Sequence, residues 1–177
     1  MDGPVVRGYT LIEFLCLLGV TAALATWAVP AFSELRLNAA RTVAVNGFVQ
    51  AVHLARSEAL KRNGVVSLCP SRDGHRCATG AGWAEGWIVF ENLDRDSPAE
   101  RDDDETLLHS QAAWVGGRVD ANRGTLSFRP FGQSGVTATL TFCDPRGGPA
   151  ARAIVISQTG RPRVADRSST GGPLSCR

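Results

Sequence analysis

The sequence predicts an α+β fold in which one long N-terminal helix is followed by an antiparallel β-sheet domain. Residues 14–33 contain no charged side chain, and this length suffices for a helix across a hydrocarbon core about 30 Å thick. Apolar residues at helical spacing continue toward residue 63, and short runs rich in β-branched and aromatic residues follow. A helical period that gives way to strand-like runs without later helices indicates this architecture.

The first element begins with a carboxylate at the edge of the apolar run. Glu13 lies inside an apolar stretch that starts at Tyr9. A charge in such a stretch costs about 2.5 to 3.5 kcal/mol on insertion, so a functional partner is expected. The segment resembles the prepilin peptidase site of type IV pilins in the residues Arg7, Gly8, Tyr9, Thr10, Leu11, Ile12 and Glu13.

This resemblance implies processing and assembly through the N-terminal segment. It implies cleavage between Gly8 and Tyr9 by a prepilin peptidase, methylation of the new amino terminus, and pairing of Glu13 with the amino group of a neighbouring subunit. Pro30 stands where pilins often carry a helix-kinking proline. Two alternatives remain open: a secretory signal peptide cut after Ala25, which would release a soluble periplasmic binding protein, and an anchor that is not cut.

The helix is predicted to continue beyond the membrane segment. The apolar residues with i, i+3, i+4, i+7 spacing are Val45, Phe48, Val49, Val52, Ala55, Ala59 and Leu60. Asn63 and Gly64 form a C-terminal signal. The predicted divisions are therefore a leader peptide over 1–8, a helix over 9–63 with its membrane-spanning part over about 9–32, and a β-rich domain over 64–177.

The β-rich domain is predicted from six short runs separated by Gly, Pro and Asp clusters. These runs are residues 65–68, 86–90, 106–108, 125–128, 136–142 and 153–157. Their β-branched and aromatic content is typical of strands. Because no helical pattern intervenes, antiparallel pairing is expected.

Five cysteines divide into Cys16, in the apolar run, and four in the polar remainder. The four allow three pairings, which the sequence leaves open. Pairing by proximity, Cys69 with Cys77 and Cys143 with Cys176, closes loops worth about 2.5 and about 4 kcal/mol in the chain-entropy model. The spacings do not suit zinc, so we expect disulfides in an oxidising compartment, with free thiols as the alternative.

Charge is unevenly distributed along the chain, although the net charge is only +2. Residues 91–105 hold eight acids against two arginines, a net charge of −6, and residues 144–177 hold six arginines against two aspartates, a net charge of +4. A polyanion would be attracted to the C-terminal part. The acidic segment lacks the glycine and ligand spacing of an EF-hand, so we expect a solvated hairpin loop and no metal site.

Three further stretches resemble the GspH/FimT group of type IV filament subunits. They are residues 56–63, 86–90 and 160–163, which read RSEALKRN, GWIVF and GRPR. The group includes pseudopilins of type II secretion and minor pilins of type IV pili, which assemble with other pilins through the N-terminal helix. The resemblance implies a single-pass subunit of the bacterial inner membrane, with a cytoplasmic N-terminus and a periplasmic C-terminal domain, that later enters the filament.

The last of these stretches is similar to the element associated with DNA binding in FimT-like minor pilins of naturally transformable bacteria. Pro162 between Arg161 and Arg163 predicts an extended, exposed turn that presents both guanidinium groups to phosphate oxygens. The predicted site for double-stranded DNA comprises Gly160, Arg161, Arg163, Arg167, Arg146 and Arg152. No aromatic residue follows Phe142, so binding should be weak, salt dependent and insensitive to sequence.

Other interpretations compete with DNA binding. The arginines could solubilise the surface or pair with the acidic segment of a neighbour, and the chain could be a GspH-like structural pseudopilin of a type II secretion system. An enzyme is not predicted, because residues 132–135 are not a nucleophile elbow and the three histidines have no triad or metal spacing. No cofactor is expected. The tryptophans expected in the core or at its edge are Trp83, Trp87 and Trp114.

Overall fold

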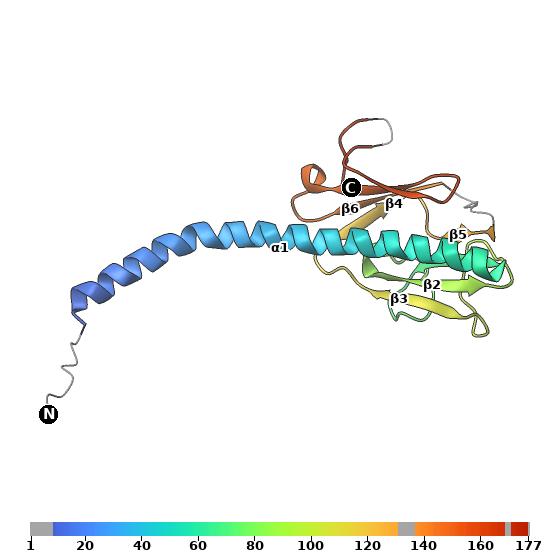
Figure 1. Cartoon of the computed structure of the whole chain (residues 1–177), viewed down its shortest axis with the longest axis horizontal. Helices are drawn as coiled ribbons and strands as arrows, with labels where there is room; N and C mark the ends of the chain where they lie inside the picture. The colour runs from blue at the N-terminus through green and yellow to red at the C-terminus, as the bar shows by residue number, and fades with distance from the viewer. Residues whose placement is uncertain (1–8, 131–136, 169–170, 177) are drawn as a thin grey trace, which may run out of the picture. The chain divides into compact units, whose positions relative to one another are not determined.

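A computed structural model describes residues 9–130, 137–168 and 171–176 (Figure 1). One long helix, α1 (Leu11–Arg62), precedes strands that pair in antiparallel sheets, so the predicted α+β class is confirmed. The chain divides into two compact units, residues 1–39 and residues 40–177. The predicted leader, residues 1–8 with Gly8, lies outside the described residues.

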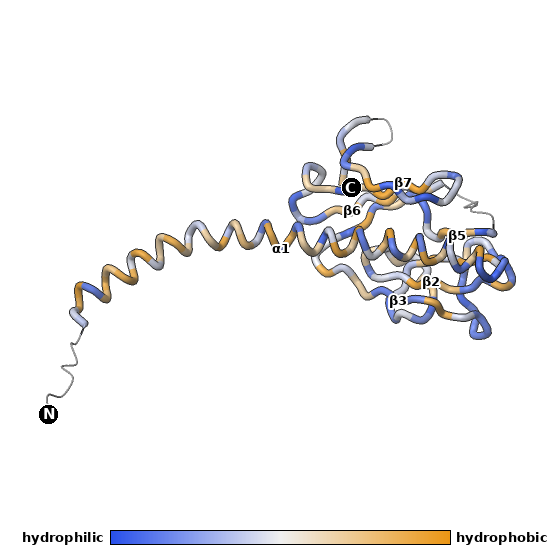
Figure 2. Tube along the Cα trace, in the orientation of Figure 1, coloured by the Kyte–Doolittle hydropathy of each residue, from blue (hydrophilic) through white to orange (hydrophobic). Residues whose placement is uncertain are grey.

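The first unit contains the N-terminal part of α1, which is long and apolar enough to cross a membrane. Figure 2 shows that hydrophobic residues dominate this part of the helix. Its large apolar side chains are exposed, Leu17 at 61% and Phe32 at 69%. Such a surface requires cover by lipid or by other chains.

The second unit includes the remainder of α1, which buries one stripe of residues. The stripe comprises Arg41, Ala44, Val45, Phe48, Ala51, Val52, Ala55 and Ala59. Intervals of three and four residues place these side chains on one face of the helix. The helix ends where Gly64 N–H donates to the Ala59 carbonyl at 3.2 Å and Asn63 N–H donates to the Leu60 carbonyl at 3.3 Å. Asn63 has a φ of 52°, so it takes the left-handed position of a Schellman cap.

The strands form two antiparallel four-stranded sheets. The first sheet has the order β3–β2–β1–β5, with β1 (Val65–Pro70), β2 (Gly86–Asn92), β3 (Leu107–Ala112) and β5 (Leu126–Phe128). The second has the order β4–β6–β7–β8, with β4 (Arg118–Ala121), β6 (Ala138–Cys143), β7 (Arg152–Ile156) and β8 (Pro162–Ala165). Short 3₁₀ helices, η1 (Trp83–Glu85) and η3 (Gly148–Ala150), precede β2 and β7.

Strands β4 and β8 are not among the runs that the sequence predicts. In β4 only Val119 is buried, so alternation gives no signal. β8 begins with Pro162, which lowers strand propensity but is tolerated at the start of an edge strand. Arg161 and Arg163 are exposed and the chain between them is extended, as predicted. The predicted turn is wrong, because the segment enters a strand that pairs with β7. Val136, at the start of another predicted strand, lies outside the described residues.

The main core joins α1 to the inner faces of both sheets. Phe48 of the helix lies against Trp83 and Trp87 on one side and Phe142 on the other. Trp83 and Trp87 are buried and Trp114 packs at the edge of the same cluster, which confirms the prediction for the tryptophans. The alternation of strand side chains sends other residues to the outer faces of the sheets.

Each outer face carries a small apolar cluster that contains one disulfide. On the first sheet, Cys69, bonded to Cys77, packs with buried Ile88 and Phe90. On the second sheet, Cys143 is bonded to Cys176, and its cluster also contains Leu174 of the C-terminal segment. The structure thus has the pairing of neighbours in sequence, and each bond holds a loop or the C-terminal segment over a sheet.

Candidate functional site

The N-terminal segment begins with a reciprocal pair of hydrogen bonds between Thr10 and Glu13. The Glu13 carboxylate accepts from the Thr10 backbone N–H and hydroxyl, each at 3.0 Å. In return, Glu13 N–H donates to Thr10 Oγ1 at 3.3 Å. This is a capping box, which satisfies donors at the start of α1. Pairing of Glu13 with another subunit remains a prediction.

Pro30 lies inside α1, and the helix is continuous through it. A proline there removes one backbone donor. The Ser33 hydroxyl donates to the Pro30 carbonyl at 2.7 Å, a local bond of the kind that serine makes within helices. A role of this proline in assembly stays a prediction.

The predicted DNA-binding motif forms the turn and second strand of the β7–β8 hairpin. Gly160 N–H donates to the Ser157 carbonyl at 2.8 Å, and Ser157 N–H donates to the Arg161 carbonyl at 3.2 Å. Gly160 has a φ of +72°, a conformation that glycine adopts without steric cost. The turn therefore depends on glycine, and it delivers Arg161 directly to the start of β8.

Arg161 and Arg163, here called the hairpin arginines, lie on one side of the extended chain. Arg163 pairs with Val155 of β7, and residues two apart in an extended chain point to the same face. Both arginines are exposed. Among the described residues, neither guanidinium has a hydrogen bond or an ion pair. Two unneutralised guanidinium groups on one side of a hairpin suit an anionic ligand with spaced charges.

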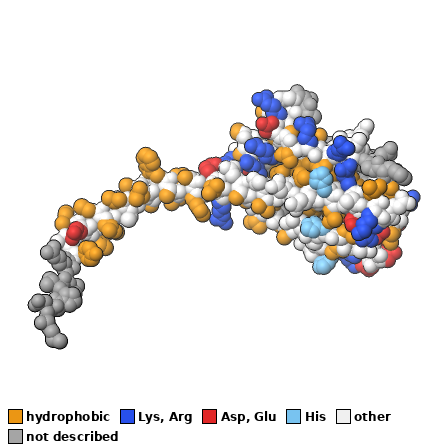
Figure 3. Space-filling view, in the orientation of Figure 1, with side chains coloured by type: hydrophobic (Ala, Val, Ile, Leu, Met, Phe, Trp, Pro, Cys, Tyr) orange, Lys and Arg blue, Asp and Glu red, His pale blue; other side chains and the backbone are white. Residues whose placement is uncertain are grey.

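Two of the other predicted DNA-binding arginines, Arg152 and Arg167, lie at the opposite end of this hairpin. Arg152 is the first residue of β7, and Arg167 follows Ala165, which pairs with Ala153. The three residues from Arg152 to Val155 span about 10 Å of strand. In Figure 3, Lys and Arg side chains are spread over the part of the second unit that holds the second sheet. The six predicted residues therefore do not converge at one point.

Arg146 differs from the hairpin arginines because its guanidinium is already engaged. It donates from Nε to Asp144 Oδ1 at 3.0 Å and from Nη2 to Oδ2 at 2.6 Å. Arg41 of α1 approaches the same carboxylate at 3.7 Å and donates to the Ala150 carbonyl. These residues, Arg41, Asp144 and Arg146, are called the Asp144 cluster below.

The Asp144 cluster connects the helix to the second sheet away from bulk solvent. The side chains of Asp144 and Arg41 are 1% and 9% exposed. The hydrogen bond from Arg146 is the main cause that lowers the pKa of Asp144. Burial lowers the pKa of Arg41, and the nearby charges of Arg152 and Arg146 act in the same direction. A buried carboxylate between two guanidinium groups is a structural link rather than a surface for DNA.

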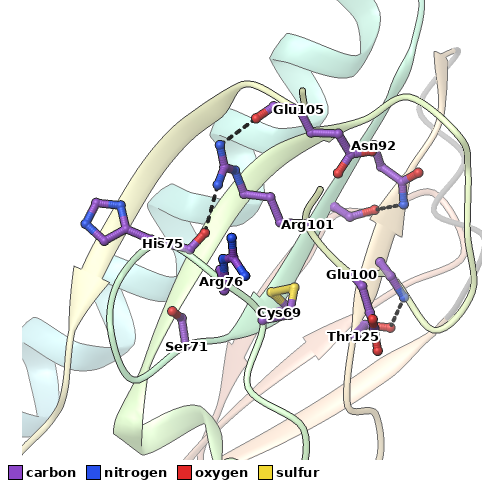
Figure 4. The surroundings of a disulfide bond; sticks show 12 residues. Cys69, Ser71, His75, Arg76, Asn92, Glu100, Arg101, Glu105 and Thr125 are labelled. Atoms are coloured by element: carbon purple, nitrogen blue, oxygen red, sulfur yellow. Dashed lines mark hydrogen bonds between the residues drawn. A yellow bond between two sulfur atoms is a disulfide. The ribbon is translucent and has the colours of Figure 1, made fainter. Parts of the chain in front are cut away.

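The acidic segment forms the loop between β2 and β3, and it organises itself with its own carboxylates. Buried Glu105 accepts from Leu93 N–H at 2.7 Å and from Asp102 N–H at 3.1 Å, and burial raises its pKa. Arg101 donates to the carbonyls of His75 and Glu105 at 3.1 and 2.7 Å, and so holds this loop near the Cys69–Cys77 disulfide (Figure 4). Within the described ranges, no group of acids, histidines or cysteines is arranged to hold a metal ion.

Two features of these sites have no role in the sequence prediction. Arg41 lies on the buried stripe of α1, and a charged residue in phase with apolar ones is a signal that could have indicated a buried ion pair. Arg56 contacts the Gly160 turn: a Cβ placed on Gly160 would be 3.1 Å from Arg56 Nε. That contact joins residues far apart in sequence, and no local pattern indicates it.

Comparison with known proteins adds a family to this geometry. Residues 44–160 match the family described as type II transport protein GspH. Pilin-like protein PilA1 of Thermus thermophilus is 32% identical over 167 residues, which cover 89% of this chain and 97% of that protein. Two crystal structures of the type IV minor pilin FimU of Pseudomonas aeruginosa match with TM-scores of 0.55 and 0.56 at 20% and 21% identity. They cover 77% of this chain and 94% and 99% of the FimU chains, and they show a shared fold.

Proposed function

The chain belongs to the GspH family and is a minor pilin or pseudopilin of a type IV pilus or a type II secretion system; from this premise we propose that it serves in a type IV pilus and binds duplex DNA. The pilus is favoured over the secretion system because the relative that matches across most of the chain is pilin-like. The fold is also that of a type IV minor pilin. DNA capture by such a subunit would serve uptake for natural transformation when the filament retracts.

The observation that carries DNA binding is the state of the hairpin arginines. Both are exposed, both lie on one side of the chain, and no carboxylate of the described residues lies within ion-pair distance. Arginine suits phosphate because its planar donors match the phosphate oxygens. The described part of the chain offers no exposed aromatic residue beside them for base stacking, so contacts to the DNA backbone should dominate and sequence preference should be small.

We expect loss of the hairpin arginines to weaken DNA binding strongly. The double change Arg161→Ala, Arg163→Ala removes two phosphate contacts, which lowers the slope of log affinity against log salt by about 1.8. That slope corresponds to about a 60-fold loss of affinity near 0.1 M salt, with little change near 1 M. The measurement is a binding titration of the full chain, in nonionic detergent, with duplex DNA across a salt series.

The matched control is the double change Arg72→Ala, Arg76→Ala. It removes the same charge from two exposed arginines that are already paired, Arg72 with Glu85 and Arg76 with Asp103. A net-charge effect alone would weaken both double variants equally. Equal binding by the hairpin variant and the unchanged protein would contradict DNA binding and favour a structural pseudopilin of a type II secretion system.

We also propose that the subunit is processed between Gly8 and Tyr9 and is anchored by residues 9–32, with its N-terminus cytoplasmic and residues 64–177 periplasmic. The apolar helix of the first unit supports an anchor, and the Cys69–Cys77 and Cys143–Cys176 disulfides suit an oxidising compartment. Glu13 would then pair with the amino terminus of a neighbouring subunit within the filament.

Mass spectrometry of the chain isolated from cell membranes is expected to find an N-terminal peptide that begins with methylated Tyr9. Cleavage between Gly8 and Tyr9 keeps Glu13 and the uncharged run after it in the mature chain. The run would anchor the subunit, and Glu13 would serve in assembly. A mature chain that begins at Thr26 in the soluble fraction would instead indicate a signal peptide cut after Ala25. An intact Met1 in membranes would indicate an anchor that is not cut.

A further inference from the structure

We propose that Arg56 of α1 is a third phosphate-binding arginine of the surface formed by the hairpin arginines. This inference rests on the proposed DNA binding and extends it to a residue outside the C-terminal motif. Arg56 precedes Arg161 by more than a hundred residues, so only the packing of the helix against the hairpin brings them together.

The contact between Arg56 and the hairpin occurs at Gly160. A Cβ on Gly160 would stand 3.1 Å from Arg56 Nε and 3.3 Å from its Cδ. Both distances are closer than ordinary van der Waals contact, so glycine leaves the space that the Arg56 side chain occupies. Gly160 immediately precedes Arg161, so the Arg56 side chain meets the hairpin at the residue next to the first of the hairpin arginines.

The Arg56 side chain is held at this place without an acceptor. Its Nε is buried and has no hydrogen-bond partner. In the described part of the chain, its guanidinium makes no hydrogen bond and no ion pair. An arginine on the same helix behaves differently, because Arg62 donates to Glu58 at 2.7 Å and to Glu91 at 2.9 Å. Arg56 thus shares with the hairpin arginines the lack of a carboxylate partner among the described residues.

An anion that reaches both the hairpin and α1 would give these three arginines the partners that the described residues do not supply. The ligand must carry several spaced negative charges, because one phosphate cannot satisfy donors from the helix and from both positions of the hairpin. Successive phosphates of a DNA strand meet this requirement. The DNA backbone would therefore lie across the end of the hairpin and along α1.

The test compares Arg56→Gln with Arg76→Gln in the full chain, bound to duplex DNA across a salt series in nonionic detergent. Both changes remove one charge and keep a long polar side chain, but Arg76 is exposed and paired with Asp103. Loss of one phosphate contact is expected to lower the salt slope by about 0.9 and the affinity by about eightfold near 0.1 M salt. Arg76→Gln should leave the slope unchanged.

The salt slope separates this role from a structural one. If Arg56 only supported the Gly160 turn, Arg56→Gln would weaken binding by a similar factor at every salt concentration, and the inference would be wrong. It would also be wrong if Arg56→Gln and Arg76→Gln behaved alike while the hairpin double variant lost its two contacts, although DNA binding would then stand. If the hairpin double variant also bound normally, the proposed function itself would fail.

Discussion

The Phe48→Ala variant is expected to lose about 3 to 5 kcal/mol of the free energy of unfolding of the second unit. Phe48 is fully buried and makes edge-to-face contacts with Trp83 and Trp87, each with ring centroids 5.2 Å apart, and with Phe142 at 6.0 Å. It therefore joins the helix to both sheets. Its removal leaves a cavity between rigid elements that cannot close without separating the helix from one of the sheets.

Denaturant unfolding of the full chain in nonionic detergent, followed by tryptophan fluorescence, measures this loss. Trp83 and Trp87 line the cavity, so their emission reports the affected region. The control is Val43→Ala on the same helix, where the side chain is 69% exposed and the expected change is within about 0.5 kcal/mol. Comparable losses in the two variants would show that Phe48 does not bridge the sheets as described.

The Asp144→Asn variant is expected to cost about 3 to 5 kcal/mol, because it leaves a buried guanidinium without its anion. Arg41 as a whole residue is 7% exposed, and Arg146 and Arg152 add positive charge near it. The exposed pair of Asp103 with Arg76 is the matched control, since Asp103→Asn should cost at most about 1 kcal/mol.

A double-mutant cycle isolates the contribution of the Asp144 cluster. Arg41→Gln removes the buried charge that Asp144→Asn leaves without its anion. The double variant should therefore lose much less free energy of unfolding than the sum of the losses in the two single variants. Strictly additive losses would mean that Asp144 and Arg41 do not interact.

The stability difference between the unchanged protein and Asp144→Asn should also depend on pH. The folded pKa of Asp144 is lowered by the Arg146 hydrogen bond, so the carboxylate contributes stability that is fully present above the unfolded pKa of about 3.9. That contribution is lost as pH falls through the lower folded pKa, and the two proteins should then converge. Buried Glu105 has a raised pKa and acts with the opposite sign in both proteins, so it cancels in the comparison.

Much of the fold was predictable because it follows from local pattern. The uncharged run, the helical stripe through Phe48 and the cap at Asn63 are local features, because each depends on residues that are close together in the sequence. The α+β class and the filament family follow from that helix and from short motifs before and within the domain. Strand β8 was not predictable in the same way, because Pro162 is unfavourable within a strand unless the neighbouring edge accepts it.

The candidate site also has one part that follows from the local sequence and another that depends on tertiary contacts. The sequence by itself determined that Arg161 and Arg163 lie on one face of the chain after Gly160, because residues two apart in an extended chain point to the same side. Only the tertiary structure decided that Arg152 and Arg167 lie at the other end of the hairpin, that Asp144 meets Arg41 of α1, and that Arg56 reaches the Gly160 turn. Strand register and helix packing set those distances, and both depend on contacts between segments far apart in the chain, which local periodicity does not encode.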